Sequence, residues 1–182
     1  MKYFTKKLWE SAQNLDPISD YANRWQRALD EYTEQLNRLR PRLDNDAFAF
    51  FSEADVHDGE LLDLIIADGS RPAALSEPVR QWRHITNHPV TVNLAVLDSR
   101  DKLVWRVSYQ CLRRVLVDFP TEIPFSYTDG EGFGDWGYHE LTDAGAGFLR
   151  HEVLFASGAI LLFEFTSVTV SCVPRSVPGV GL

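Results

Sequence analysis

The chain has little cysteine, with only Cys111 and Cys172 among its 182 residues. Each lies in an apolar, strand-like run, without a CxxC motif or a histidine at metal-ligand spacing. We therefore expect two buried thiols in a reducing compartment rather than a disulfide framework. A chain of this length buries about 70% of the surface that it exposes when unfolded, so its fold requires neither disulfides nor a structural metal.

Long hydrophobic runs are also missing. The longest uncharged apolar run covers residues 153–163 and is too short to span a bilayer. The first ten residues carry charges but lack the apolar segment of a signal peptide. These features predict a cytoplasmic protein without a membrane partner.

Basic residues are in deficit, since 18 Lys and Arg stand against 26 Asp and Glu and give a net charge of −8. Nucleic acids and anionic lipids bind basic surfaces, so this balance argues against both as main partners. A basic protein or a cationic ligand fits the charge better.

The familiar catalytic motifs are absent from the sequence. No serine stands in a nucleophile elbow, no Walker loop or GxGxxG follows a strand, and no Cys/His pair has a local signature. His84 and His88 are four residues apart, but the glutamate of a zinc-protease helix is missing. The acids of residues 129–140 match some calcium-loop positions, but Phe133 occupies a ligand position. Known motifs therefore identify no activity.

Helical periodicity dominates the first third of the chain. Apolar residues recur every three or four positions over residues 18–39 and stop before Pro41, which predicts a long amphipathic helix. Thr5 is a suitable N-cap for a short helix before it, and Asp16-Pro17 offers a cap and a first-turn proline for the long one. The phenylalanines of residues 46–55 predict a third short helix.

From residue 59 onward the pattern becomes that of β-strands. Strands are predicted at residues 60–68, 90–98, 102–118 with a bend, 136–141, 147–156 and 159–170. Hairpin turns are expected at 98–101 and 157–158, and one helical turn is expected to open at 76–78 and to end at Pro89.

Together these elements predict one α+β domain over residues 1–182. Two or three N-terminal helices in residues 1–56 pack on a mostly antiparallel sheet of five to six strands in residues 59–172. Residues 173–182, with two prolines and two glycines, are expected to form a flexible tail.

The last hairpins place several reactive side chains in one row. If a two-residue turn closes the final hairpin, His151 lies opposite Glu164, and a symmetric turn at residues 142–146 places Tyr138 on its other side. A histidine between a carboxylate and a phenol is an oriented acid/base group, and Glu140 lies one step along the same face. The competing interpretation is a hydrogen-bonded polar cluster in the core. We favour the cluster, because a register slip of one residue would destroy the row.

A second candidate site is His57-Asp58, between the third helix and the first strand. A rigid element ends there and side chains can converge, which suits a metal ion or a substrate. Asp and His also commonly cap turns at such junctions. A metal site would need further ligands, for which His139-Glu140 and His151-Glu152 are the obvious sources. We predict no cofactor, and a divalent metal ion stays the open alternative.

Residues 118–143 carry seven acidic side chains and no lysine or arginine. Aromatic residues lie among these acids, and this mixture anchors many protein interfaces. A surface for a basic protein partner is therefore predicted here. Its candidate contact residues are Asp129, Glu131, Phe133, Asp135 and Trp136.

Three segments resemble a family of uncharacterised bacterial proteins: the opening MKYFTK with Leu8-Trp9, the His57-Asp58 pair, and the closing hairpin from Trp136 to Phe165. The resemblance implies a bacterial origin, a helix-plus-sheet layout and no established activity. The His-Asp pair and the acidic hairpin are also similar to small immunity proteins from toxin systems. No functional residue carries over from either group.

Two functions are compatible with these features. The first is a non-enzymatic, immunity-like module that binds a protein or a ligand. The second is a metal-assisted hydrolase built around one cavity, which requires its candidate residues to converge. Those residues are His57, Asp58, Glu140, His151 and Glu164. We favour the binding module.

Overall fold

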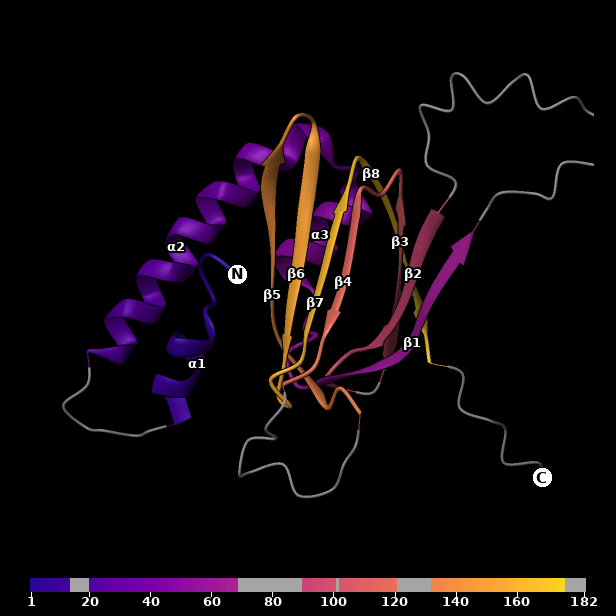
Figure 1. The fold of residues 1–182 in the computed structure, drawn as a ribbon. Helices are drawn as coiled ribbons and strands as arrows, with labels where there is room; N and C mark the ends of the chain where they lie inside the picture. The colour runs from indigo at the N-terminus through magenta and orange to yellow at the C-terminus, as the bar shows by residue number, and fades with distance from the viewer. Residues whose placement is uncertain (14–19, 69–89, 101, 121–131, 176–182) are drawn as a thin grey trace, which may run out of the picture.

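The computed structural model describes residues 1–13, 20–68, 90–100, 102–120 and 132–175, and it shows an α+β fold (Figure 1). The helices come first along the chain. They are α1 (Lys6–Gln13), α2 (Tyr21–Leu39), the 3₁₀-helix η1 (Arg40–Arg42) and α3 (Asn45–Glu53). The three α-helices lie where helical periodicity predicts them.

Local chemistry explains where the helices begin and end. The Thr5 hydroxyl oxygen accepts a hydrogen bond from the Leu8 amide at 3.2 Å, and the Asp44 carboxylate accepts one from the Ala47 amide at 2.7 Å. Both side chains satisfy amides that a helix N-terminus leaves unpaired. Helix α2 gives way to η1 at Pro41, as expected. The expected cap at Asp16-Pro17 lies outside the described residues.

Within the described residues, eight strands form one antiparallel sheet. They are β1 (Gly59–Asp68), β2 (Val90–Leu97), β3 (Leu103–Gln110), β4 (Arg114–Asp118), β5 (Asp135–Gly145), β6 (Phe148–Phe155), β7 (Ile160–Phe165) and β8 (Ser167–Pro174). Their order is β4-β7-β6-β5-β1-β2-β3-β8. The antiparallel arrangement is confirmed, but the expected number of five to six strands is too low.

The difference arises because two expected strands each consist of two. Residues 102–118 break at Cys111, whose φ of 53° turns the chain from β3 into β4. Residues 159–170 break between β7 and β8, and β8 continues to Pro174. The two bends lie side by side, since the Arg113 amide donates to the Glu164 carbonyl oxygen at 2.9 Å. Both long segments therefore bend together, and the sheet curls.

The sheet separates between β1 and β5, because only two residue pairs join these strands, both at the start of each strand. Gly59 lies at this junction, where a Cβ atom would stand 2.3 Å from the Leu97 carbonyl oxygen, so only glycine fits. Beyond it, the free edge of β5 is covered by α2 and the N-terminal segment. The Leu141 amide, for example, donates to the Tyr32 hydroxyl oxygen at 3.2 Å.

Helix α3 fills the concave side of the curled sheet, whereas α2 runs outside β5 (Figure 1). Phe50 and Phe51 of α3 are at most 3% exposed, and both rings contact His151. Tyr109 and Phe163 stack across the interior at 4.9 Å between ring centroids. The core is thus unusually aromatic, and it encloses a histidine.

The expectation of two buried thiols is wrong. Cys111 is partly exposed because it occupies the bend between β3 and β4. Cys172 is exposed on β8, which is an edge strand of the sheet. The helical turn expected at 76–78 lies outside the described residues, as does most of the expected tail.

Among the described residues, no helix combines the length and the apolar composition that crossing a membrane requires.

Candidate functional site

The proposed row Tyr138-His151-Glu164 does not form. His151 pairs with Phe163 on β7 and with Leu141 on β5. The final hairpin has a three-residue loop, Ala156–Gly158, in which the Phe155 amide donates to the Ala159 carbonyl oxygen. One residue more than expected moves Glu164 to the opposite face of the sheet.

The hairpin between β5 and β6 also differs from the expected one, which had a symmetric turn at residues 142–146. Strand β5 continues to Gly145, and Ala146 and Gly147 form a two-residue turn with φ values of 53° and 82°. Positive φ at both positions is typical of a type I′ hairpin turn. Tyr138 consequently pairs with Leu154 rather than with His151.

Glu164 forms a structural ion cluster on the outer face of the sheet. Its oxygens accept from Arg113 Nε at 2.6 Å and from Arg150 Nη2 at 2.6 Å. Burial works to raise the pKa of Glu164, but the two guanidinium groups outweigh burial and hold this pKa below its usual value. The carboxylate is therefore fully paired within the protein.

Glu140 anchors the N-terminal segment, residues 1–5. Its side chain is fully buried and accepts hydrogen bonds from the backbone amides of Lys2, of Tyr3 at 2.8 Å and of Phe4 at 3.2 Å. Glu152 on β6 adds an ion pair with the α-ammonium group of Met1 at 2.7 Å. These contacts bring Phe4 against Trp25 and Tyr138.

His151 belongs to a buried chain of hydrogen bonds. Its Nδ1 lies 2.6 Å from the Tyr109 hydroxyl, and its Nε2 lies 3.1 Å from His139 Nδ1. Sequence reasoning missed Tyr109, because β3 and β6 become neighbours across the interior only when the sheet curls. It named His139 only as a source of metal ligands. The competing interpretation, a polar cluster in the core, fits His151.

The buried phenol of Tyr109 determines which group donates in each of these hydrogen bonds. Tyr109 is 0% exposed, and His151 is its hydrogen-bond partner, so the phenol O–H donates to His151 Nδ1. His151 must then donate from Nε2 to His139 Nδ1. This leaves His139 with a donor at Nε2, on the far side of its ring.

Both histidines are neutral at pH 7. Burial lowers the pKa of His151 well below its usual value, and the neighbouring His139 lowers it further. Burial also lowers the pKa of His139, to about 4. Burial raises the pKa of Tyr109 well above its usual value, so the phenol keeps its proton.

His139 lies on the wall of a pocket of about 330 Å³ between α2, α3 and β5. We call this cavity the aromatic pocket. Its ring-bearing lining residues are Phe4, Trp25, Tyr32, Phe48, Phe51, His57, Tyr138 and His139. Its other polar lining residues are Thr33, Asn37 and Ser52.

The His57-Asp58 pair stands at the rim of the same pocket. His57 Nδ1 lies 3.0 Å from the Asp58 carboxylate, and the two side chains are 48% and 71% exposed. The His57 ring also packs on Tyr138. Burial raises the pKa of Tyr138, with smaller contributions from Tyr21 and Asp58, so Tyr138 is a neutral phenol.

The hydrolase candidates therefore converge only in part. Of the candidates, His57 lines the aromatic pocket and His151 lies behind the pocket residue His139, whereas Glu140 and Glu164 are engaged elsewhere. In the part of the chain that the structure describes, no three His, Cys, Asp or Glu side chains lie together as a metal site would require.

The acidic segment is described only at its ends, and Asp129 and Glu131 lie outside the described residues. Phe133 packs on Phe119 and Phe155. Trp136 is fully buried in the core, and Asp135 is exposed. Residues 132–135 line a recess of about 640 Å³ together with Asp58, Gly59, Glu60, Leu61, Asp98 and Ser99. We call it the acidic recess.

Fold and site together define an α+β protein in which helices close a curled antiparallel sheet around a histidine-containing pocket. Comparisons with protein-family models and with curated proteins find no match. Among solved structures, the chain is similar to an uncharacterized protein from Neisseria gonorrhoeae, with 11% identity and a TM-score of 0.42, over 63% of this chain and 91% of that one. A TM-score of this size supports no argument about fold or function.

Proposed function

We propose that the protein is a non-enzymatic ligand-binding module and that the aromatic pocket is its binding site. The observation that carries the proposal is the chain from Tyr109 through His151 to His139, which fixes a hydrogen-bond donor on the pocket wall. Buried polar groups that orient one donor toward a cavity are typical of ligand sites.

The lining favours an uncharged ligand. None of the described lining residues is Lys, Arg, Asp or Glu, and His139 is neutral at pH 7. A charged ligand would lose its hydration without gaining a partner of opposite charge. The rings of the lining favour a flat apolar body, and the His139 donor requires an acceptor. We therefore expect a small ring compound that carries a carbonyl group.

Binding of three matched probes tests this proposal: acetophenone, ethylbenzene without the carbonyl oxygen, and charged benzoate. In NMR titrations of the protein, acetophenone should bind tightest and benzoate weakest. The variant His139→Phe keeps a ring but removes the donor, so it should weaken acetophenone up to about tenfold and leave ethylbenzene unchanged.

Ser52→Ala is the control, because the Ser52 hydroxyl already donates to the Phe48 carbonyl oxygen of its own helix at 2.7 Å. This variant should bind acetophenone as the wild type does. If none of the three probes perturbs residues around the pocket, the proposed function is wrong. If ethylbenzene binds as well as acetophenone, only the role of His139 is wrong.

Capture of a basic protein, as in an immunity-like module, is the second candidate. It is supported by the acidic recess, where the exposed residues Asp58 and Glu60 meet the end of the acidic segment. A lysine-rich peptide should bind here, and more weakly as salt rises. Glu60→Gln should weaken this binding, while Glu34→Gln on the exposed face of α2 should not. Equal binding by both variants would contradict the candidate.

A metal-assisted hydrolase is the remaining alternative, supported by the His57-Asp58 pair at the pocket rim. Mass spectrometry of the purified protein, together with melting curves in zinc, manganese and calcium, separates it from the binding module. Stoichiometric metal that disappears in His57→Ala would favour the hydrolase. Under our proposal we expect no melting shift that depends on His57.

A further inference from the structure

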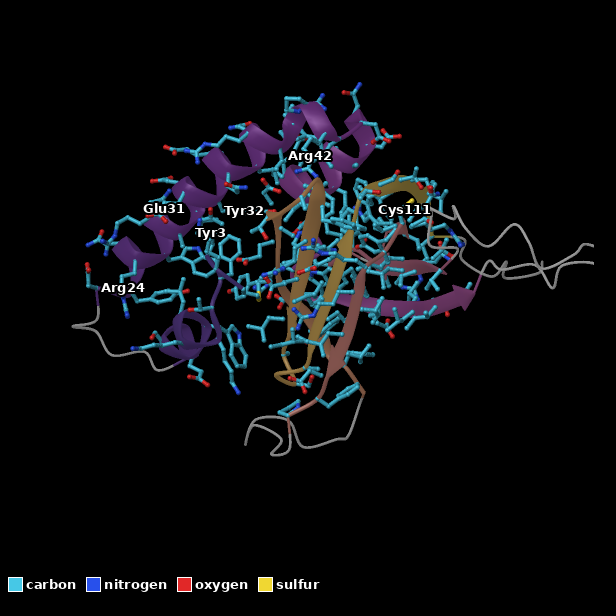
Figure 2. All side chains as sticks on the ribbon, turned by 45° about the horizontal axis from the view of Figure 1, so that its top comes forward. Tyr3, Arg24, Glu31, Tyr32, Arg42 and Cys111 are labelled. Carbon is cyan, nitrogen blue, oxygen red and sulfur yellow. The ribbon has the colours of Figure 1, made fainter. Side chains whose placement is uncertain are left out.

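We infer that a second site, between the N-terminal segment and α2, binds the phosphate group of a ligand. The site is a recess of about 370 Å³, distinct from the aromatic pocket. Its lining residues are Lys2, Tyr3, Thr5, Lys7, Leu8, Arg24, Arg27, Ala28 and Glu31. We call it the basic recess. Figure 2 shows Arg24 near the start of α2, Glu31 farther along this helix, and Tyr3 beside it.

The charge of the basic recess is opposite to that of the whole chain. Four cationic side chains and one carboxylate line it, whereas the chain has a net charge of −8. On an acidic protein, a local cluster of this kind creates a positive potential that attracts anions. The recess is therefore a feature that the overall charge does not explain.

Arg24 gives the basic recess an unsatisfied donor. Its Nε is buried and has no hydrogen-bond partner among the described residues, while the Arg24 residue as a whole is partly exposed. Two neighbouring cations already have partners. Arg27 donates to the Asn23 carbonyl oxygen and pairs with the Asp20 carboxylate. Lys2 Nζ donates to the Tyr3 hydroxyl at 2.9 Å. Leaving one buried N–H of a guanidinium unpaired costs free energy, so an external acceptor is expected at Arg24.

Charge and geometry select a phosphate group. The guanidinium fork matches two oxygens of a phosphate or a carboxylate. Because the cations outnumber the carboxylate by three in the basic recess, a dianionic phosphate gains more than a singly charged carboxylate. The recess also has room for the molecule that carries the phosphate.

The basic recess and the aromatic pocket lie on different sides of α2. Arg24, Arg27 and Glu31 face the recess, whereas Trp25 and Tyr32 face the pocket. Tyr3 lines one cavity and the next residue, Phe4, lines the other. The two sites can therefore be tested separately, and the phosphate site does not depend on the proposed function.

Titration with inorganic phosphate, followed through the arginine Nε–H resonances, tests the site. Addition at constant ionic strength should shift the Arg24 resonance and raise the melting temperature, whereas acetate and chloride should do so less. Arg24→Gln should bind phosphate at least about tenfold more weakly, as expected for a lost charge-assisted hydrogen bond. Arg38→Gln is the control, because Arg38 lies on the same helix but pairs with Glu34.

A second variant keeps the test decisive if Arg24→Gln fails to fold. Glu31→Gln removes the one carboxylate that lines the basic recess and should strengthen phosphate binding. Absence of any phosphate-dependent change at Arg24, or equal weakening by Arg24→Gln and Arg38→Gln, would overturn the inference. Glycerol phosphate and vesicles that contain phosphatidic acid, both of which carry a phosphate monoester, then distinguish a soluble phosphate ester from a lipid headgroup.

Discussion

At the scale of single residues, the chain Tyr109-His151-His139 shows how a buried polar group depends on one partner. His151 is 0% exposed, so each ring nitrogen must find its partner inside the protein. The sequence favoured a hydrogen-bonded polar cluster around His151 over an oriented row with Tyr138 and Glu164, and in the structure the partners of His151 are Tyr109 and His139. The partner could not be predicted, because Tyr109 is 42 residues away in the chain and meets His151 only across the curled sheet.

Tyr109→Phe should change the tautomer of His151. Without the phenol, His151 Nδ1 loses its donor, and the ring is free to carry its proton on either nitrogen. We expect a loss of about 1–2 kcal/mol in the free energy of unfolding, and nitrogen NMR should show a mixture of tautomers at both histidines. Tyr21→Phe, near the start of α2, is the control. An unchanged Nε2–H tautomer of His151 would contradict the direction that we assign to the chain.

At the scale of secondary-structure elements, helices and strand positions were predictable, but register was not. Apolar periodicity defines α2 and α3 because one face of each is buried. Pairing depends instead on loop length, and one additional residue between β6 and β7 places His151 and Glu164 on opposite faces. The bend at Cys111 was expected only from the length of residues 102–118.

The N-terminal segment is held by one side chain rather than by its own secondary structure. Glu140→Gln keeps the shape of the side chain but replaces one of its two oxygens by an NH2 group that cannot accept, so a single oxygen is left for the backbone amides of Lys2, Tyr3 and Phe4. We expect a loss of about 2–3 kcal/mol in the free energy of unfolding. Hydrogen exchange should accelerate at these amides.

The exposed substitution Glu34→Gln is the matched control for Glu140→Gln, because Glu34 is 71% exposed and pairs with Arg38 at the surface. This variant should change stability by less than about 0.5 kcal/mol. If Glu140→Gln were as mild, Glu140 would not anchor the segment. The aromatic pocket would then have to hold Phe4 by ring packing alone.

At the scale of the whole molecule, the α+β layout was predictable, because the spacing of apolar residues changes once along the chain, near Gly59, from that of helices to that of strands. The curling of the sheet was not predictable, since it depends on paired bends in segments far apart in sequence. The arrangement of the candidate site could not be predicted for the same reason. His57, His139 and His151 could be listed from the sequence, but their grouping follows from curvature.

The buried histidines make the stability of the whole fold depend on pH. The pKa of His139 is about 4 in the folded protein and about 6.5 when the chain is unfolded, so the unfolded state binds more protons between these values. The contribution of the histidines to the free energy of unfolding should therefore be constant above about pH 7 and fall as pH falls from 6.5 to 4. His139 alone contributes a loss of about 3 kcal/mol over this window.

Urea unfolding at a series of pH values between 7.5 and 4 separates this effect from that of the carboxylates. Glu164, whose pKa is lowered by Arg113 and Arg150, stabilises the fold above its usual pKa of 4.5 and loses its contribution only below it. The slope between pH 6.5 and 5 should thus belong to the histidines. His139→Phe should reduce it, and Glu164→Gln should leave it unchanged. A flat profile between pH 7 and 5 in the wild type would mean that water reaches His151, and the donor that we place on the pocket wall would have no fixed direction.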